Sequence, residues 1–299
     1  MRILMTGGTG FIGRALVARL LQRGNQLTVL SRNPSKAVAL LGDRVRIWES
    51  LGQWQADTAF DAVINLAGEP IIDKAWTAER KQVLLASRVG ITGQLIAAMT
   101  RSVHKPAILL SGSAIGIYGD AGQTHCTETS ALADDFAASL CRSWERAAAG
   151  AEALAVRTVF LRTGLVLHED GGMLKKMRLP FKLGLGSRLG DGRQIMSWIH
   201  RQDYLDAVLF LLDNVSCRGA FNLTAPHPVC NAEFTRILAE SLGRKAVLVT
   251  PEFALKPVLG ARSILLFGGQ HVKPAKLLAA GFVFRYPHLT DALQNAGVH

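Results

Sequence analysis

The sequence offers little that a metal or redox protein would need. Its four cysteines are Cys126, Cys141, Cys217 and Cys230, and they form no C-x-x-C pair. None of them has a histidine at zinc-ligand spacing, so the pattern favours neither a metal site nor a redox motif. We therefore expect no metal, and thiols that stay reduced as in a cytosolic protein.

Long apolar runs are also missing. Although 49% of the residues are hydrophobic, no uninterrupted apolar stretch approaches the ~20 residues that a membrane span requires. Arg2 is followed at once by a strand-like stretch, without the apolar region of a signal peptide. These features predict a globular cytoplasmic protein with a large buried core and no membrane partner.

Acidic residues are in deficit. The 23 Asp and Glu against 34 Lys and Arg give a net charge of +11, which favours anionic partners in general. The basic residues stand singly or in pairs, however, and form no basic strip interleaved with aromatic residues of the kind that binds single-stranded nucleic acid. We expect no nucleic-acid partner, and a small-molecule substrate that is anionic or sugar-like.

What the sequence does contain is an alternation of short apolar runs with helix-length amphipathic segments. This pattern predicts an α/β fold with a Rossmann-type doubly wound parallel sheet. From about Gly164 the alternation weakens, and we expect a smaller C-terminal mixed α/β substrate lobe there. The expected strands are residues 3–5, 27–30, 62–66, 107–110 and 156–161. The expected division is a Rossmann domain at 1–163, to which 203–223 returns with a helix and a short strand, and a substrate-side lobe at 164–202 and 224–299.

Three glycines follow the first predicted strand. Gly7, Gly10 and Gly13 have the spacing G-x-x-G-x-x-G and precede a predicted helix. Glycine at these places permits a tight turn, close approach of the backbone to a pyrophosphate, and close packing of helix on strand. A glycine triplet alone is weak evidence and can be an ordinary turn. Its position between a strand and a helix makes it a predicted dinucleotide site.

The residues after the second predicted strand select the cofactor. A carboxylate there would accept a hydrogen bond from the ribose 2′-hydroxyl of NAD, whereas cationic and hydroxyl groups would receive the 2′-phosphate of NADP. This sequence has Ser31 and Arg32, with Lys36 nearby, and no Asp or Glu between Leu27 and Lys36. The pattern favours NADP(H), with Arg32 as an ordinary surface charge as the alternative reading.

Several motifs together resemble the extended short-chain dehydrogenase/reductase family. The broad set is Thr6-Gly7-Gly8-Thr9-Gly10-Phe11-Ile12-Gly13, Asn65-Leu66-Ala67-Gly68, Ser111-Gly112-Ser113 and Tyr118-Gly119-Asp120. A narrower set resembles its atypical, epimerase-like subgroup, the NAD(P)-dependent epimerase family proteins of YfcH type. That set is Ser87-Arg88-Val89, Arg162-Thr163-Gly164, Leu179-Pro180-Phe181, Ser197-Trp198-Ile199-His200 and Asn222-Leu223.

The resemblance implies a cofactor site built from the ends of the strands. Ser31 and Arg32 would hold the adenosine phosphate, and the backbone of Leu66 and Ala67 would run along the cofactor. Arg88 occupies a position where many extended members have Asn. The full set of cofactor-binding residues implied is Gly7, Gly10, Phe11, Ile12, Gly13, Ser31, Arg32, Leu66, Ala67, Gly68, Arg88 and Leu165.

The sequence departs from the family at its catalytic pair. The family's Tyr-x-x-x-Lys uses the lysine to lower the pKa of the tyrosine. Aligned on Glu145, the two positions here read Ala137 and Cys141, and none of the three tyrosines is followed by a lysine four residues later. The usual residues for proton transfer are therefore missing.

Three residues are candidates to replace the pair. Ser113 stands at the end of the fifth strand and Tyr118 just beyond it, so the two could polarise a carbonyl together. His200 precedes the helix predicted at 203–212 and could exchange a proton near neutral pH. Each has a structural alternative: a strand-end hydroxyl bonded to backbone, a packed aromatic ring, and a helix cap.

Two charged residues near these candidates have open roles. Arg162 either neutralises an anionic substrate group or is tied to a carboxylate of the protein. Glu145 is expected on a solvated helix face or in an ion pair with Arg142.

Two functions follow from these patterns. The first is an NADP(H)-binding, epimerase-like oxidoreductase of unknown substrate that uses Ser113 with Tyr118 or His200. The second is a non-catalytic regulatory or scaffold protein whose NADP(H) occupancy is sensed by a protein partner. Retention of Ser113 favours the first function, and loss of the Tyr and Lys favours the second.

Overall fold

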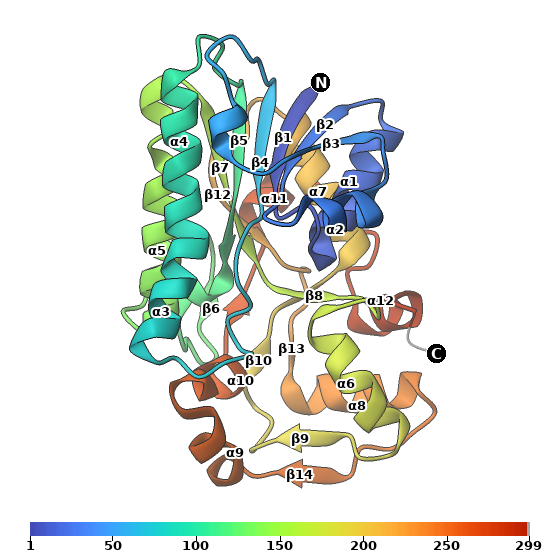
Figure 1. Cartoon of the computed structure of the whole chain (residues 1–299). Helices are drawn as coiled ribbons and strands as arrows, with labels where there is room; N and C mark the ends of the chain where they lie inside the picture. Colours follow the sequence, from blue (N-terminus) through green and yellow to red (C-terminus); the bar gives the residue numbers. More distant parts are fainter. Residues whose placement is uncertain (298–299) are drawn as a thin grey trace.

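A parallel sheet of seven strands forms the centre of the molecule, seen in Figure 1 from a computed structural model that describes residues 1–297. The strands are β1 (Arg2–Thr6), β2 (Gln26–Leu30), β3 (Val45–Trp48), β4 (Ala62–Asn65), β5 (Ile108–Ala114), β7 (Arg157–Thr163) and β12 (Gly219–Leu223). Their order is β12-β7-β5-β4-β1-β2-β3. The chain winds outward from β1 in both directions, so the predicted Rossmann-type doubly wound sheet is confirmed.

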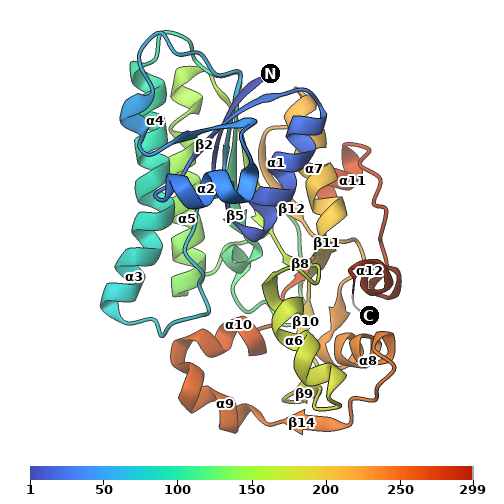
Figure 2. The same cartoon turned by 45° about the vertical axis from the view of Figure 1, so that its right-hand side comes forward.

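Helices cover both faces of this sheet (Figures 1 and 2). On one face, Ile3 and Met5 of β1 share a core with the two helices that pack on each other, α1 and α7. On the other face, Leu4 packs with Leu95 and Met99. Successive residues of a strand point to opposite faces, and both faces are covered, which explains why Ile3, Leu4 and Met5 form an uninterrupted apolar run. The helices of this part are α1 (Phe11–Gln22), α2 (Pro34–Leu41), α3 (Ala78–Leu85), α4 (Ile91–Arg101), α5 (Phe136–Ala149) and α7 (Arg201–Asp213).

One of these layers is a continuous helical run. α3, the π-helical turn η2 (Ala86–Gly90) and α4 follow one another without a break. The 24 residues from Ala78 to Arg101 have a mean hydropathy of 1.4 in their most apolar window, enough by length and composition for a membrane span. Leu95, Ala98 and Met99 of this run are buried in the core beneath the sheet. The run therefore serves as a covering layer of the Rossmann part.

The remaining segments form a lobe below the carboxyl ends of the strands (Figure 2). Its core joins Leu174 and Phe181 of α6 to Phe234 of α8 and Leu293 of α12, with Trp198 fully buried between them. The helices of this part are α6 (Gly172–Lys182), α8 (Asn231–Ser241), α9 (Glu252–Leu259), α10 (Ile264–Phe267) and α12 (Leu289–Asn295), whereas α11 (Ala275–Ala279) lies beside the central sheet. The short strands are β6 (His125–Cys126), β8 (Leu165–Leu167), β9 (Ser187–Leu189), β10 (Ile195–Met196), β11 (Trp198–His200), β13 (Val229–Cys230), β14 (Leu248–Thr250) and β15 (His271–Val272), and short 3-10 turns lie at Leu51–Gln53, Ile115–Tyr118, Glu152–Leu154 and Gly260–Ser263.

The structure differs from the sequence expectations in two places. The strand β3 was not expected, because it has only four residues, and Arg44 and Arg46 flank its first apolar residue. Leu277, Phe282 and Phe284 fall in the segment that we expected in the second lobe. They instead belong to the core of the Rossmann part, where α11 packs on β12.

Candidate cofactor site

The glycine turn between β1 and α1 brings two chain segments into close contact. Gly7 has a φ of +71°, a region that L side chains rarely adopt. A Cβ on Gly7 would also lie 2.5 Å from the carbonyl carbon of Leu66. A Cβ on Gly13 would overlap the carbonyl oxygen of Gly7, which accepts a hydrogen bond from the N–H of Gly10 at 3.0 Å. Only glycine fits at Gly7 and Gly13, because backbone atoms of Leu66 and Gly7 already occupy the space that a Cβ would need.

A groove of about 750 Å³ lies above this turn. Seven of the expected cofactor residues line it: Gly7, Gly10, Ser31, Arg32, Leu66, Ala67 and Gly68. The groove also includes Glu49, Ser50 and Leu51, which follow β3. These three residues were not expected in the site, because the strand β3 before them was not expected.

The other five expected cofactor residues lie outside the lining of the groove. Phe11 packs against Gly171 and lies 5.5 Å from the guanidinium carbon of Arg201. Ile12 packs on the core, and Gly13 is buried within the turn. Leu165 begins β8 and packs against the core of the lobe. Arg88 lies directly behind the groove, where its guanidinium is 3.1 Å from the position of a Cβ on Gly68.

The end of β2 has the polar groups that a 2′-phosphate requires. Ser31, Arg32, Asn33 and Lys36 line the groove there, and the side chain of Asn33 caps α2 by accepting from the N–H of Lys36. Two of these four residues are cationic, and none is acidic. The donor set therefore fits NADP(H).

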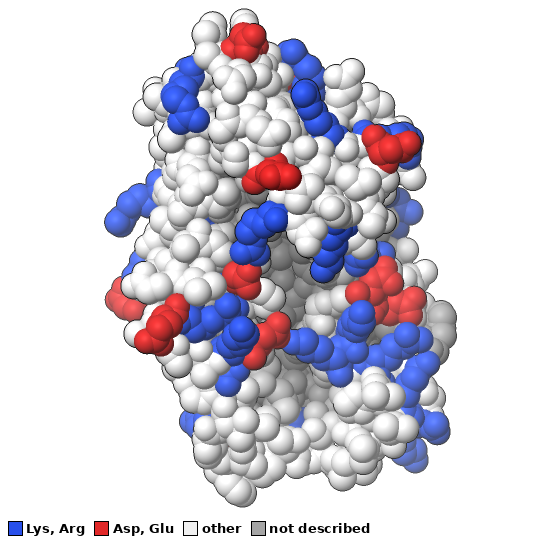
Figure 3. Space-filling model, in the orientation of Figure 1, with Lys and Arg blue, Asp and Glu red and all other residues white. Residues whose placement is uncertain are grey.

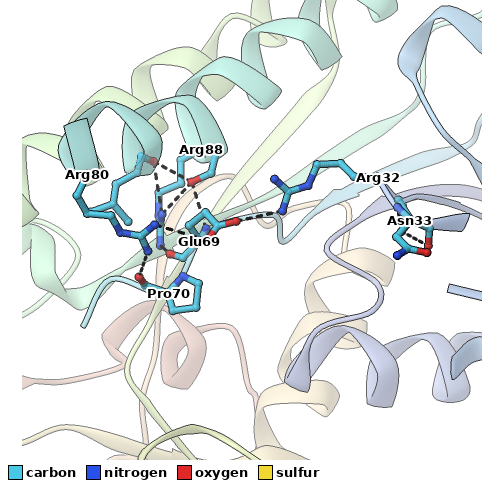
Figure 4. Close-up of polar contacts among 9 residues, drawn as sticks. Arg32, Asn33, Glu69, Pro70, Arg80 and Arg88 are labelled. Carbon is cyan, nitrogen blue, oxygen red and sulfur yellow. Dashed lines mark hydrogen bonds and ion pairs between the residues drawn. The ribbon is translucent and has the colours of Figure 1, made fainter. Parts of the chain in front are cut away.

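Glu69, which follows β4, is a site residue that the sequence did not reveal (Figure 4). Its carboxylate lies 3.0 Å from Nη2 of Arg32 and 3.7 Å from Nη1 of Arg80. Its backbone N–H donates to Oγ of Ser87, and its carbonyl accepts from Nη2 of Arg88. The hydrogen bond from Arg32 is the main cause that lowers the pKa of Glu69. The groove thus contains a fixed carboxylate opposite the cations that follow β2.

The expected catalytic hydroxyl of Ser113 points to a carboxylate of the protein. Its Oγ donates to Oε1 of Glu145 at 2.7 Å. Glu145 also binds Arg162 through two hydrogen bonds, from Nε at 2.8 Å and from Nη2 at 2.9 Å. Both side chains of this pair are largely buried, with 12% and 6% exposed. The expectation that Glu145 is solvated or pairs with Arg142 is therefore wrong, and Arg162 is tied to a carboxylate of the protein.

Tyr118 belongs to the same buried network. Its hydroxyl accepts from Nη1 of Arg162 at 2.9 Å and donates to Oδ1 of Asn222 at 2.7 Å. The ring is buried in a small apolar cluster with Cys126 and Val272. Burial raises the pKa of Tyr118 above its ordinary value of 10. Tyr118 therefore has a structural role in this network, and it does not line the cofactor groove.

The positions of the missing pair lie on the buried face of α5. Ala137 and Cys141 are both buried, and Asp135 caps the helix by accepting from the N–H of Ala137. Burial raises the pKa of the Cys141 thiol to about 12. A thiol of that pKa is protonated at neutral pH and is a poor nucleophile or base. Neither side chain performs the role of the Tyr or the Lys.

His200 ends β11 and caps α7. Its Nδ1 accepts from the N–H of Gln202 at 3.1 Å, and its ring packs edge-on against Tyr286. Burial lowers the pKa of His200 to about 4, so the ring is neutral at pH 7. The histidine lines a cavity of about 290 Å³ that shares no lining residue with the cofactor groove. His200 is therefore the N-cap of α7, which was the structural alternative for this residue, and its position gives no support to a catalytic role.

Cations gather beside a hollow on the face shown in Figure 3, over α6 and next to the cofactor groove. Helix α6 has Lys175, Lys176, Arg178 and Lys182. Lys176 reaches across to Asp73, with Nζ 2.5 Å from Oδ1. Arg262 of the lobe donates to the carbonyl of Ile72 at 2.8 Å. Two contacts therefore tie the loop after β4 to the lobe.

Comparison with known proteins gives the family. A family model described as the NAD dependent epimerase/dehydratase family matches residues 3–224, and one described as a domain of unknown function (DUF1731) matches residues 250–296. The epimerase family protein YfhF of Bacillus subtilis is 37% identical over 99% of this chain and 97% of its own length. The structure of human epimerase family protein SDR39U1 with NADPH has 34% identity and a TM-score of 0.89, covering 99% of both chains. A nucleoside-diphosphate sugar epimerase from Corynebacterium glutamicum has 30% identity and a TM-score of 0.78, over 99% of this chain and 58% of the other.

The sheet order, the glycine turn and the groove define a Rossmann-type dinucleotide-binding protein. The chain belongs to the NAD dependent epimerase/dehydratase family, as an atypical short-chain dehydrogenase/reductase without the Tyr-x-x-x-Lys pair.

Proposed function

We propose that this protein binds NADP(H) and works as an oxidoreductase of the epimerase type. The observation that supports this cofactor is the segment after β2, where Ser31, Arg32 and Lys36 line the groove and no residue between Leu27 and Lys36 is acidic. The human relative, at 34% identity, was crystallised with NADPH, which supports the same cofactor here. Bound NADP(H) supplies a hydride donor or acceptor. Ser31, Arg32 and the backbone after β4 hold it in place.

The substrate that we propose is small and anionic or sugar-like. The cations over α6 beside the cofactor groove support an anionic group on the substrate. Ser113 remains the residue that we propose to orient a substrate oxygen, because it lies one residue before the end of β5, the strand next to β4, whose following residues line the groove. Its hydroxyl proton is directed to Glu145, so Ser113 would accept a hydrogen bond from a substrate hydroxyl. A cytoplasmic location remains a prediction.

A second function is favoured by the loss of the acid and base. Ala137 and Cys141 replace the Tyr and Lys, and the hydroxyl protons of Ser113 and Tyr118 go to Glu145 and Asn222. A protein with these contacts that still binds NADP(H) would suit a non-catalytic role, in which a protein partner distinguishes the empty from the occupied state.

A substrate screen separates the two functions. The oxidoreductase predicts steady oxidation of NADPH, or reduction of NADP⁺, with a member of a panel of carbonyl compounds and nucleotide sugars. No turnover across the panel by protein with intact NADPH binding would count against it. The regulatory function predicts a partner whose affinity differs between the empty and the NADPH-bound protein, and pull-downs in both states would detect that difference.

A further inference from the structure

An ion pair joins the two walls of the cofactor groove. Arg32 follows β2 on one wall, and Glu69 follows β4 on the other. Their side chains meet with Nη2 of Arg32 3.0 Å from Oε1 of Glu69 (Figure 4). The cation that would hold a 2′-phosphate therefore already has an anionic partner of the protein.

The two members of this pair are held very differently. Glu69 is anchored through its backbone by Ser87 and Arg88, and through its carboxylate by Arg80, whose side chain is only 10% exposed. Arg80 is fixed in turn by donating to the carbonyl of Pro70 at 2.6 Å. The side chain of Arg32 is 90% exposed, and within residues 1–297 Glu69 is its one ion-pair partner. The side chain of Arg32 is therefore the member of the pair that is free to change position, whereas Glu69 is held in place.

We propose that Glu69 is a specificity-determining residue of the cofactor site, because it competes with the 2′-phosphate for Arg32. This inference rests on the proposed binding of NADP(H). A phosphorylated dinucleotide binds when Arg32 exchanges the carboxylate of Glu69 for the phosphate, while Arg80 continues to balance the charge of Glu69. A dinucleotide without the phosphate leaves the ion pair in place. Glu69 thus lowers the affinity for NADP(H) selectively.

The size of the effect follows from the exposure of the pair. An ion pair between exposed side chains changes an equilibrium constant by at most about fivefold. A phosphate of charge near −2 binds a guanidinium more strongly than a carboxylate does, so Arg32 gains by exchanging Glu69 for the phosphate. The loss of the ion pair with Glu69 offsets part of that gain. Removing the charge of Glu69 should therefore tighten NADPH binding by about three- to fivefold.

The test is the affinity of the full chain for NADPH and for NADH, measured by isothermal titration calorimetry. Glu69→Gln keeps the shape and the hydrogen-bonding capacity of the side chain. It should bind NADPH about three- to fivefold more tightly than the wild type and leave the affinity for NADH unchanged. Glu240→Gln is the matched control, because it removes the carboxylate of an exposed Arg–Glu ion pair that lies outside the groove. It should have no more than a small effect.

The Arg32→Ala background separates competition from simple repulsion. If Glu69 acts by occupying Arg32, the gain from Glu69→Gln disappears when Arg32 is absent. Unchanged or weaker NADPH binding by Glu69→Gln, an equal gain for NADH, or a gain that persists in Arg32→Ala would overturn the inference. If Glu69→Gln proves unstable, Glu69→Ala, with its folding checked by thermal melting, should likewise bind NADPH more tightly than the wild type.

These measurements also separate this inference from the proposed cofactor. If Arg32→Ala weakens NADPH binding and Glu69→Gln changes nothing, only the role of Glu69 fails. If the wild type binds NADPH no more tightly than NADH, and Arg32→Ala has no effect, the proposed cofactor fails as well.

Discussion

Ser113 donates its hydroxyl proton to Glu145, across 2.7 Å between the end of β5 and the middle of α5. Because Arg162 binds both oxygens of the same carboxylate, this hydrogen bond is part of a buried network that also includes Tyr118 and Asn222. Two of the three residues expected to perform chemistry are thus members of a structural network. In this chain the position of a hydroxyl at a strand end does not make it a proton donor to substrate.

The buried pair of Glu145 and Arg162 should be important for stability. Glu145→Gln leaves the guanidinium of Arg162 without its counter-charge, and breaking such a pair costs about 3 kcal/mol or more. Urea denaturation followed by circular dichroism would measure the change in the free energy of unfolding.

The exposed pair of Arg236 and Glu240 provides the control, since 59% and 57% of these side chains are exposed. Glu240→Gln should change the free energy of unfolding by less than about 1 kcal/mol. Adding Arg162→Met to Glu145→Gln should recover part of the loss, because no buried charge then remains. Equal effects of Glu145→Gln and Glu240→Gln would contradict the role assigned to the buried pair.

Cys141 should be inert in the folded protein. Its pKa is raised to about 12 by burial, so almost no thiolate is present at pH 8. We expect a thiol reagent to modify the partly exposed Cys230 first and Cys141 only on unfolding. Peptide mapping by mass spectrometry after brief alkylation would show the order, and modification of Cys141 at the rate of Cys230 would argue against the buried position.

Acid should weaken the fold through His200. Its pKa is about 4 in the folded state and near 6.5 when unfolded, so the unfolded chain binds the proton more tightly. The neutral ring contributes about 3 kcal/mol to the free energy of unfolding, a contribution that is fully present above pH 6.5 and is lost as the pH falls toward 4. The free energy of unfolding measured between pH 7 and pH 4 should fall over this window.

His200→Asn isolates this effect. Asn does not titrate, and its side-chain oxygen can still accept from the N–H of Gln202 as an N-cap. The variant should have a flatter dependence of stability on pH between 6.5 and 4. An unchanged slope would mean that other groups cause the loss.

The sequence predicted those parts of the site that depend on neighbouring residues. Gly7, Gly10 and Gly13 form one turn whose geometry depends on the absence of side chains, and Ser31 and Arg32 follow directly from the end of β2. The glycine turn and the residues after β2 can therefore be predicted from short segments of the chain.

The contacts that could not be predicted join distant segments. Arg32 meets Glu69 across 37 positions in the sequence, and Ser113 meets Glu145 across 32. Such pairs depend on the order of the strands and the rotation of a helix on the sheet, which motifs do not specify. Glu145 lies one position beyond Trp144 on the face of α5 that packs against β5, and the pattern of charges alone suggested a solvated helix.

The most direct test of the account is the selectivity of the groove for the 2′-phosphate. Isothermal titration of the wild type and of Arg32→Ala with NADPH and NADH measures it without knowledge of the substrate. We predict that the wild type binds NADPH more tightly than NADH, and that Arg32→Ala weakens NADPH binding by about tenfold, as expected for loss of a charge-assisted phosphate contact, while NADH binding stays the same. Equal affinities for the two cofactors in the wild type, unaffected by Arg32→Ala, would contradict the assignment of this site to NADP(H).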